Sequence, residues 1–195
     1  MHQATPIDYI RLTTAALWLI LVIVWIVNAS RTKRTIQSQA GFAQVFYIVL
    51  PIVGAALIFV PKTGIPWLDR PLFPVTAPSA LACFFVVLIG VAFTLWARFV
   101  LGRNWSNDVA VKEDHTLMRT GPYRIARHPI YSGILLGMLG SAFQHGELRC
   151  FIGVFFFFLA YWLKSLAEER FMVQTFGDQY VQYRRKVKAL VPFIF

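Results

Sequence analysis

The sequence predicts an all-α integral membrane protein with about five transmembrane helices, a C-terminal helical hairpin and a cytoplasmic amphipathic helix. First, the 195 residues are 57% hydrophobic and only 14% charged, whereas about 25% of the residues of an average soluble domain are charged. Second, the mean hydropathy is +0.59, and five apolar windows approach the ~17 to 25 residues that a helix needs to cross a bilayer. Third, the basic residues gather in alternate loops, as they do in multi-pass membrane proteins. We expect a single membrane domain over residues 1–195.

The five apolar windows are predicted to be helices because a helix satisfies its own backbone polar groups inside hydrocarbon. They cover residues 9–28, 42–60, 78–101, 128–145 and 150–166. The connection 61–78 holds five of the ten prolines, and proline removes a backbone donor and breaks helices. This connection is therefore predicted to be irregular and to lie along the outer surface.

The last two windows are predicted to form an antiparallel hairpin, because the segment QHGEL (144–148) between them is long enough only for a tight turn. Gly133 and Gly137 form a small-xxx-small face, which lets helix backbones approach closely in lipid. After Leu163 the helix is expected to leave the membrane and to end at Gly177. A short basic helix should then begin at Asp178.

The basic residues give the expected topology. On the side that we predict to be cytoplasmic lie Arg31, Lys33, Arg34, Arg98, Arg103, Lys112, Arg119, Arg124, Arg127, Lys164, Arg170, Arg184, Arg185, Lys186 and Lys188. The other side has only Arg11, Lys62, Arg70 and Arg149. With five crossings, the positive-inside rule places the N-terminus outside and the C-terminus in the cytoplasm. The formal charge of +10 then reflects topology and contact with anionic membrane lipids, and we expect no nucleic-acid partner.

The two cysteines, Cys83 and Cys150, lie in or beside apolar windows and form no CxxC pair. They are interpreted as small core residues, so we expect neither a disulfide framework nor a metal site.

Two polar clusters stand out from the apolar sequence, at residues 115–133 and 164–170. The first enters the fourth predicted helix and the second leaves the fifth. Because these helices are antiparallel neighbours, the clusters are predicted to meet at the cytoplasmic side. Arg-rich segments beside membrane helices also contact lipid headgroups, and Lys164 with Glu168 would form an ordinary surface pair at a spacing of four. Both of these simpler interpretations remain open at this point.

The residue types in the two clusters suit one kind of ligand. Arg127 and His128 offer donors beside Pro129, which favours the first turn of a helix and its anion-binding end. Glu168 and Glu169 can accept from an ammonium or a ribose. Tyrosine rings at 123 and 131 offer flat faces for an aromatic base or a cation. S-adenosylmethionine has an anionic end, a cationic end and an aromatic base, so it fits this set.

The motifs GRNWS (102–106), HTLMRTGPYRIARHPIYSG (115–133), EER (168–170), FGDQYVQYRRKV (176–187) and VPFIF (191–195) resemble the isoprenylcysteine carboxyl methyltransferase family. That family is related to the phospholipid methyltransferases, and the resemblance covers roughly residues 100–195. It implies N-terminal transmembrane helices in 1–100 and a cofactor-binding, catalytic region in 101–195. It further implies a prokaryotic member, in an inner membrane, that acts as a carboxyl O-methyltransferase on a small lipophilic or lipid acceptor.

The resemblance also implies which residues act. With Arg127 added on chemical grounds, the cofactor pocket would be lined by His115, Thr116, Leu117, Met118, Tyr123, Arg127, His128, Pro129, Ile130, Tyr131 and Glu168. Lys164 stands where the family has an arginine for the substrate carboxylate, and lysine lacks the bidentate fork of arginine. An amine or hydroxyl acceptor would need a base, for which Glu169, His115 or a tyrosine are the candidates.

Two other functions fit the same composition. One is an NADPH-dependent enzyme resembling the sterol reductases, which share a similar C-terminal membrane architecture. The other is a non-catalytic membrane scaffold, whose polar clusters would serve only lipid contact and topology. The sequence leaves the methyl acceptor and the oligomeric state open.

Overall fold

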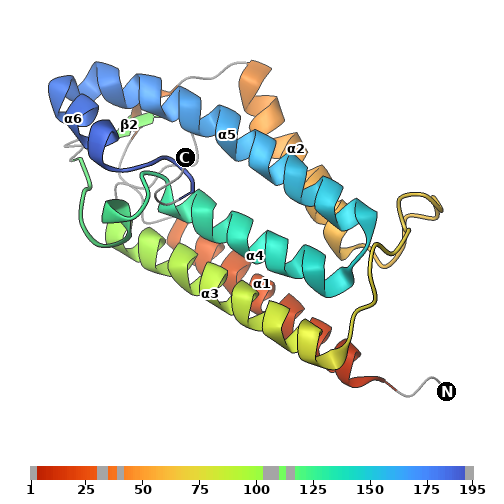
Figure 1. The fold of residues 1–195 in the computed structure, drawn as a ribbon. Helices are drawn as coiled ribbons and strands as arrows, with labels where there is room; N and C mark the ends of the chain where they lie inside the picture. Colours follow the sequence, from red (N-terminus) through yellow and green to blue (C-terminus); the bar gives the residue numbers. More distant parts are fainter. Residues whose placement is uncertain (1–3, 30–34, 39–41, 103–109, 113–116, 192–195) are drawn as a thin grey trace.

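The computed structural model describes residues 4–29, 35–38, 42–102, 110–112 and 117–191 (Figure 1). Within these ranges each of the five apolar windows is a helix, so the predicted helices are confirmed. The elements are α1 (Pro6–Ala29), β1 (Thr35–Ser38), α2 (Phe42–Phe59), α3 (Ala77–Leu101), β2 (Ala110–Lys112), η2 (Gly121–Arg124), α4 (Pro129–His145), α5 (Leu148–Phe176) and α6 (Asp178–Lys186). The strands β1 and β2 pair antiparallel. Sequence patterning did not predict this short pairing, which adds a two-stranded piece to an otherwise helical fold.

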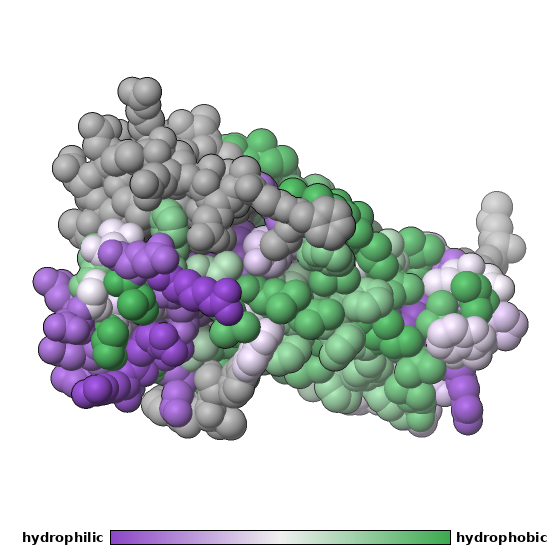
Figure 2. Space-filling view, turned by 90° about the horizontal axis from the view of Figure 1, so that it is seen from above, coloured by the Kyte–Doolittle hydropathy of each residue, from purple (hydrophilic) through white to green (hydrophobic). Residues whose placement is uncertain are grey.

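Three of the helices, α1, α3 and α5, are long and apolar enough to cross a membrane. The helices α2 and α4 are shorter, with 18 and 17 residues, and 17 residues of helix span about 26 Å. Large apolar side chains cover much of the surface, and Leu12 of α1 is 69% exposed. Figure 2 shows an apolar band between hydrophilic ends. Lipid rather than water is the solvent in which this surface is stable.

The helices pack as two groups: α4 lies on α3 beside α1, and α2 lies on α5 (Figure 1). Glycines permit both close crossings. A Cβ atom added to Gly133 would lie 2.6 Å from the Gly90 carbonyl oxygen, and one added to Gly153 would lie 2.6 Å from that of Gly54. From their tight turn, α4 and α5 diverge toward α6 (Figure 1). The polar site lies at the wide end of this wedge.

The narrow end of the wedge is held by a buried arginine. Arg149, whose side chain is 1% exposed, donates to the carbonyl oxygens of Leu57 and Val60 at 2.6 and 2.7 Å. It also pairs with Glu147 at 2.6 Å. The irregular connection after α2 runs past this turn, where Pro71 forms a β-bridge with Glu147. The connection is thus fastened to the α4–α5 hairpin at this end of the helix bundle.

The C-terminal part of the chain confirms the predicted amphipathic helix. Gly177, with a φ of +52°, separates α5 from α6, a conformation that glycine adopts without strain. On α6, Tyr180 and Tyr183 are buried, whereas Arg185 and Lys186 are exposed. The helix therefore lies against the protein with its tyrosines and presents its basic residues outward.

Candidate functional site

The two polar clusters meet in space, as predicted from the hairpin. Arg127 Nε donates to Glu169 Oε1 at 2.7 Å, and His128 Nδ1 lies 3.2 Å from Glu168 Oε2. About forty residues of chain separate these partners. They come together because α4 begins, and the polar part of α5 lies, at the same end of the bundle.

The segment before α4 is a short 3-10 turn, η2, that begins at Gly121 with a φ of +58°. It buries Tyr123, whose hydroxyl donates to the Ala97 carbonyl oxygen at 3.4 Å. Burial raises the pKa of Tyr123 far above its ordinary value, and the nearby charge of Glu168 acts in the same direction. Tyr123 is therefore a neutral residue that anchors this turn to α3.

His128 lies between the two glutamates. Its side chain is 8% exposed, with Nδ1 toward Glu168 and Nε2 3.4 Å from Glu169 Oε1. Burial alone lowers the pKa of His128, but the hydrogen bonds and charges of both glutamates outweigh burial and raise the pKa above its ordinary value. Each ring nitrogen faces one carboxylate, and a protonated imidazole would donate to both at once, so His128 orients the two glutamates.

Tyr131 forms the aromatic wall of the site. Its hydroxyl donates to Glu168 Oε1 at 2.6 Å, and its ring is parallel to that of His128 with centroids 5.6 Å apart. The ring also stacks on Tyr161 at 4.6 Å. Lys164 Nζ lies 5.7 Å from the Tyr131 ring centroid, within the range of a cation–π interaction. The prediction that Lys164 belongs to this cluster thus agrees with its position.

Glu169 is surrounded by cations. Arg127 contacts Oε1 through Nε and through Nη2, the second at 2.5 Å. Arg184 of α6 pairs with Oε2 at 3.2 Å. The Glu169 side chain is 7% exposed, whereas that of Glu168 is 21% exposed. The two adjacent glutamates therefore occupy different environments, and Glu168 is the more accessible one.

The other predicted pocket residues have mixed positions. Met118 is half-buried beside the cluster of Ala97, Tyr123 and Ile130. Pro129 is buried at the start of α4, and Ile130 packs in that same apolar cluster. Leu117 is half-buried. His115 and Thr116 lie outside the described residues.

Sequence analysis missed two residues of this cluster, Tyr161 and Arg184. Tyr161 precedes Lys164 by three residues and Glu168 by seven, so all three share one face of α5. That spacing was a usable signal. Arg184 is one of several basic residues on α6, and nothing local distinguishes it from Arg185.

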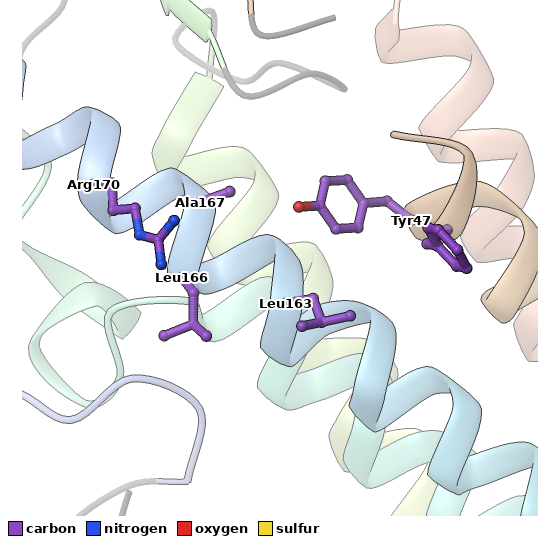
Figure 3. A pocket seen from close by; sticks show the side chains of 6 residues that line it. Tyr47, Leu163, Leu166, Ala167 and Arg170 are labelled. Atoms are coloured by element: carbon purple, nitrogen blue, oxygen red, sulfur yellow. The ribbon is translucent and has the colours of Figure 1, made fainter. Parts of the chain in front are cut away.

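An apolar cleft lies on the other side of α5, facing α2 (Figure 3). Its volume is about 200 Å³, and its lining comprises Phe46, Tyr47, Leu163, Leu166, Ala167 and Arg170. Leu163 and Ala167 are the sequence neighbours of Lys164 and Glu168, so a rotation of about 100° around α5 separates the cleft from the polar site. Arg170 is the charged residue of the lining.

Known proteins are similar to this chain in both sequence and fold. The isoprenylcysteine O-methyltransferase of Schizosaccharomyces pombe is 33% identical over 129 residues, which are 63% of this chain and 52% of that protein. That of Saccharomyces cerevisiae is 29% identical over 119 residues, 60% of this chain and 49% of that protein. Isoprenylcysteine O-methyltransferase B of Arabidopsis thaliana is 30% identical over 115 residues, 56% of this chain and 57% of that protein. The chain spans about half the length of these relatives.

A solved structure of the eukaryotic intramembrane Ras methyltransferase, an isoprenylcysteine carboxyl methyltransferase, matches with a TM-score of 0.63 and 18% identity. The match covers 98% of this chain and 69% of that one, so the two share a helical membrane fold. The resemblance inferred from the motifs is confirmed by these relatives. Residues 79–179 match the phospholipid methyltransferase family. This range contains nearly all of α3, all of α4 and both polar clusters, and the chain accordingly belongs to the phospholipid methyltransferase family.

Proposed function

We propose that this protein is an integral membrane methyltransferase that uses S-adenosylmethionine to methylate the carboxylate of a lipophilic acceptor. One observation carries the proposal: two groups of polar residues contact each other within residues 79–179, the range that matches the family. Arg127, His128 and Tyr131 form one group, and Glu168 and Glu169 form the other. The relatives named as isoprenylcysteine O-methyltransferases support the same reaction class.

The residues at the wide end of the wedge fit S-adenosylmethionine. Glu168 is oriented by His128 and Tyr131 yet keeps part of its surface open, so it can accept from an ammonium or a ribose hydroxyl. Tyr161 adds a second aromatic ring next to that of Tyr131, and the start of α4 suits a carboxylate. When bound, the cofactor supplies an electrophilic methyl group. The residues around it hold the acceptor in line and exclude water.

The charges of the site favour an acceptor that is already ionised. The cations Arg127, Lys164 and Arg184, together with His128, accompany two carboxylates. Glu169 is engaged by Arg127 and Arg184, and both ring nitrogens of His128 face carboxylates, so neither residue is well placed to remove a proton. A carboxylate acceptor needs no base, and Lys164 is the cation that we assign to it. An amine or hydroxyl acceptor would require Glu169, His115 or a tyrosine as the base.

The acceptor is proposed to reach the site from the bilayer. The cleft between α2 and α5 is apolar, it includes Arg170 in its lining, and it adjoins Lys164 around α5. A hydrocarbon chain in that cleft would leave a polar head near the cations. We further propose that the site faces the cytoplasm, with the N-terminus outside and the protein in a prokaryotic inner membrane.

Binding of the cofactor is the first test. Calorimetry on purified protein should detect S-adenosylhomocysteine and no NADPH, which separates the methyltransferase from a reductase and from a scaffold. His128→Ala and Glu168→Ala should each weaken this binding by roughly 1 to 3 kcal/mol, the usual cost of leaving a buried polar partner unpaired. NADPH binding, or unchanged affinity in both variants, would contradict the proposal.

A second test identifies the acceptor. Radiolabelled S-adenosylmethionine would be offered with prenylated cysteine carboxylates, with phosphatidylethanolamine and with lipophilic phenols. We expect methyl transfer to the carboxylates, a lower kcat/KM for Lys164→Ala, and retained activity for Lys164→Arg because guanidinium binds carboxylate with two bonds. Preferential methylation of phosphatidylethanolamine would instead establish an amine acceptor.

A further inference from the structure

We propose that Arg184 of α6 is a positioning residue of this site. Together with Arg127 it holds the Glu169 carboxylate, and this clamp fastens the C-terminal segment 177–190 across the polar cluster. The clamp follows from geometry alone, whereas its effect on S-adenosylhomocysteine binding rests on the proposed function.

The clamp is centred on Glu169. One carboxylate oxygen, Oε1, receives Arg127 Nε at 2.7 Å and lies 3.4 Å from His128 Nε2. The other oxygen, Oε2, pairs with Arg184 Nε at 3.2 Å. A carboxylate that is 7% exposed needs such partners to stay ionised. With both oxygens engaged, Glu169 has the geometry of a structural anion that joins three elements of the fold.

The C-terminal segment is attached along its length to the residues around His128. Arg127 Nη1 donates to the carbonyl oxygens of Arg184 and Val187. The main-chain N–H groups of Arg127 and His128 donate to Lys188 and Ala189 at 2.8 and 3.0 Å. Two further hydrogen bonds attach the segment. The Tyr183 hydroxyl donates to the Tyr123 carbonyl oxygen, and the Ser132 hydroxyl donates to the Leu190 carbonyl oxygen. The backbone at His128 is thus fixed by this segment.

Arg184 acts on the accessible glutamate through His128. The same imidazole ring contacts both carboxylates, so how strongly it interacts with Glu169 depends on the other cations that contact Glu169. Without Arg184, Glu169 would interact more strongly with His128, and His128 would then hold Glu168 in place less well. The Arg184 side chain is 48% exposed, and ion pairs with exposed partners contribute little to overall stability. Its loss should therefore affect the site more than the unfolding of the protein.

The neighbouring residue provides a matched control. Arg185 is exposed and carries the same charge on the same helix, but the clamp does not include it. The comparison uses Arg184→Ala, Arg185→Ala and the charge-conserving Arg184→Lys in the full-length protein in detergent. Hydrogen exchange of the Arg127 and His128 amides reports the attachment of the C-terminal segment, because its carbonyl groups accept from those amides.

We expect exchange at these two amides to rise roughly fivefold in Arg184→Ala and S-adenosylhomocysteine affinity to fall by a similar factor, the scale of one partly exposed ion pair. Arg185→Ala should match the parent in both measurements. Arg184→Lys should recover most of the loss.

Three results would overturn the positioning role. The first is equal amide exchange in Arg184→Ala and Arg185→Ala. The second is a loss of unfolding free energy in Arg184→Ala, measured from its thermal midpoint, that is as large as its loss of binding free energy. The third is an unchanged affinity for S-adenosylhomocysteine in Arg184→Ala despite faster exchange. If the parent does not bind S-adenosylhomocysteine, the proposed function fails, and the exchange comparison between Arg184→Ala and Arg185→Ala still decides whether the clamp exists.

Discussion

The Tyr131 ring lies parallel to the Tyr161 ring, with centroids 4.6 Å apart and 7° between the planes. The two residues come from α4 and α5, in the region where these helices diverge. Their stack therefore fixes the separation of the helices beside the polar cluster. Because the Tyr131 hydroxyl also holds Glu168 at 2.6 Å, the stack connects helix packing to the position of the accessible carboxylate.

Removal of the Tyr161 ring should loosen this connection. Tyr161→Ala is expected to destabilise the protein by roughly 2 to 3 kcal/mol, less than for a fully buried aromatic residue because Tyr161 is only partly buried, and to lower cofactor affinity. Tyr161→Phe keeps the stacked ring and should resemble the parent. Phe155→Ala on the same helix is the control, since that ring is 56% exposed. Thermal unfolding in detergent measures the effect, and equal losses for Tyr161→Ala and Phe155→Ala would refute the stack's role.

The charge on His128 predicts a pH dependence. Its pKa is raised above the ordinary value of 6.5 despite burial, since both glutamates stabilise the imidazolium in the folded protein. This contribution to stability is complete below the unfolded pKa and is lost as the pH rises through the raised folded pKa. The parent should therefore exceed His128→Gln in thermal midpoint by roughly 2 to 4 °C near pH 6. The gap should narrow in alkaline buffer, and a gap that widens with pH would contradict the assignment.

The crossing of α3 and α4 predicts a steric effect at Gly133. A Cβ there would lie 2.6 Å from the Gly90 carbonyl oxygen and 2.8 Å from the Thr94 backbone nitrogen. Both are backbone atoms, which cannot move aside as the end of a flexible side chain can. Gly133→Ala should cost roughly 1 to 3 kcal/mol, as overpacking does. Leu136→Ala is the control, because Leu136 is 38% exposed on the same helix. A Gly133→Ala protein as stable as the parent would show that the helices can separate freely.

The proposed orientation is tested by labelling in cells with a membrane-impermeant maleimide. Arg70 and Gln182 are both exposed. Arg70 belongs to the connection between α2 and α3 and Gln182 to α6, and these two segments lie at opposite ends of the helix bundle (Figure 1). In a variant without Cys83 and Cys150, Arg70→Cys should be labelled from outside, and Gln182→Cys should react only after the membrane is permeabilised. The reverse pattern would place the site on the other face of the membrane.

The sequence alone determined the helices and their ends. Hydrophobic run length is a local property, so the five windows predicted α1 to α5 within a few residues, and the predicted continuation of the last helix beyond Leu163 to Gly177 matches the end of α5 at Phe176. Proline and glycine are equally local signals, and Gly177 marked the break before α6 because few other residues adopt a positive φ. The tight turn at Gly146 made α4 and α5 antiparallel, and that constraint was enough to predict that Arg127 and His128 would meet Glu168 and Glu169.

Only the tertiary structure decided which partners each polar residue takes. Arg184 and Arg185 are indistinguishable in a list of basic residues, yet the rotation of α6 about its buried tyrosines turns the first toward Glu169 and the second outward. The stack of Tyr131 on Tyr161 depends on how far α4 and α5 have diverged at that point of the wedge. Such choices depend on distances between elements, and a one-dimensional pattern of hydropathy and charge carries no information about those distances.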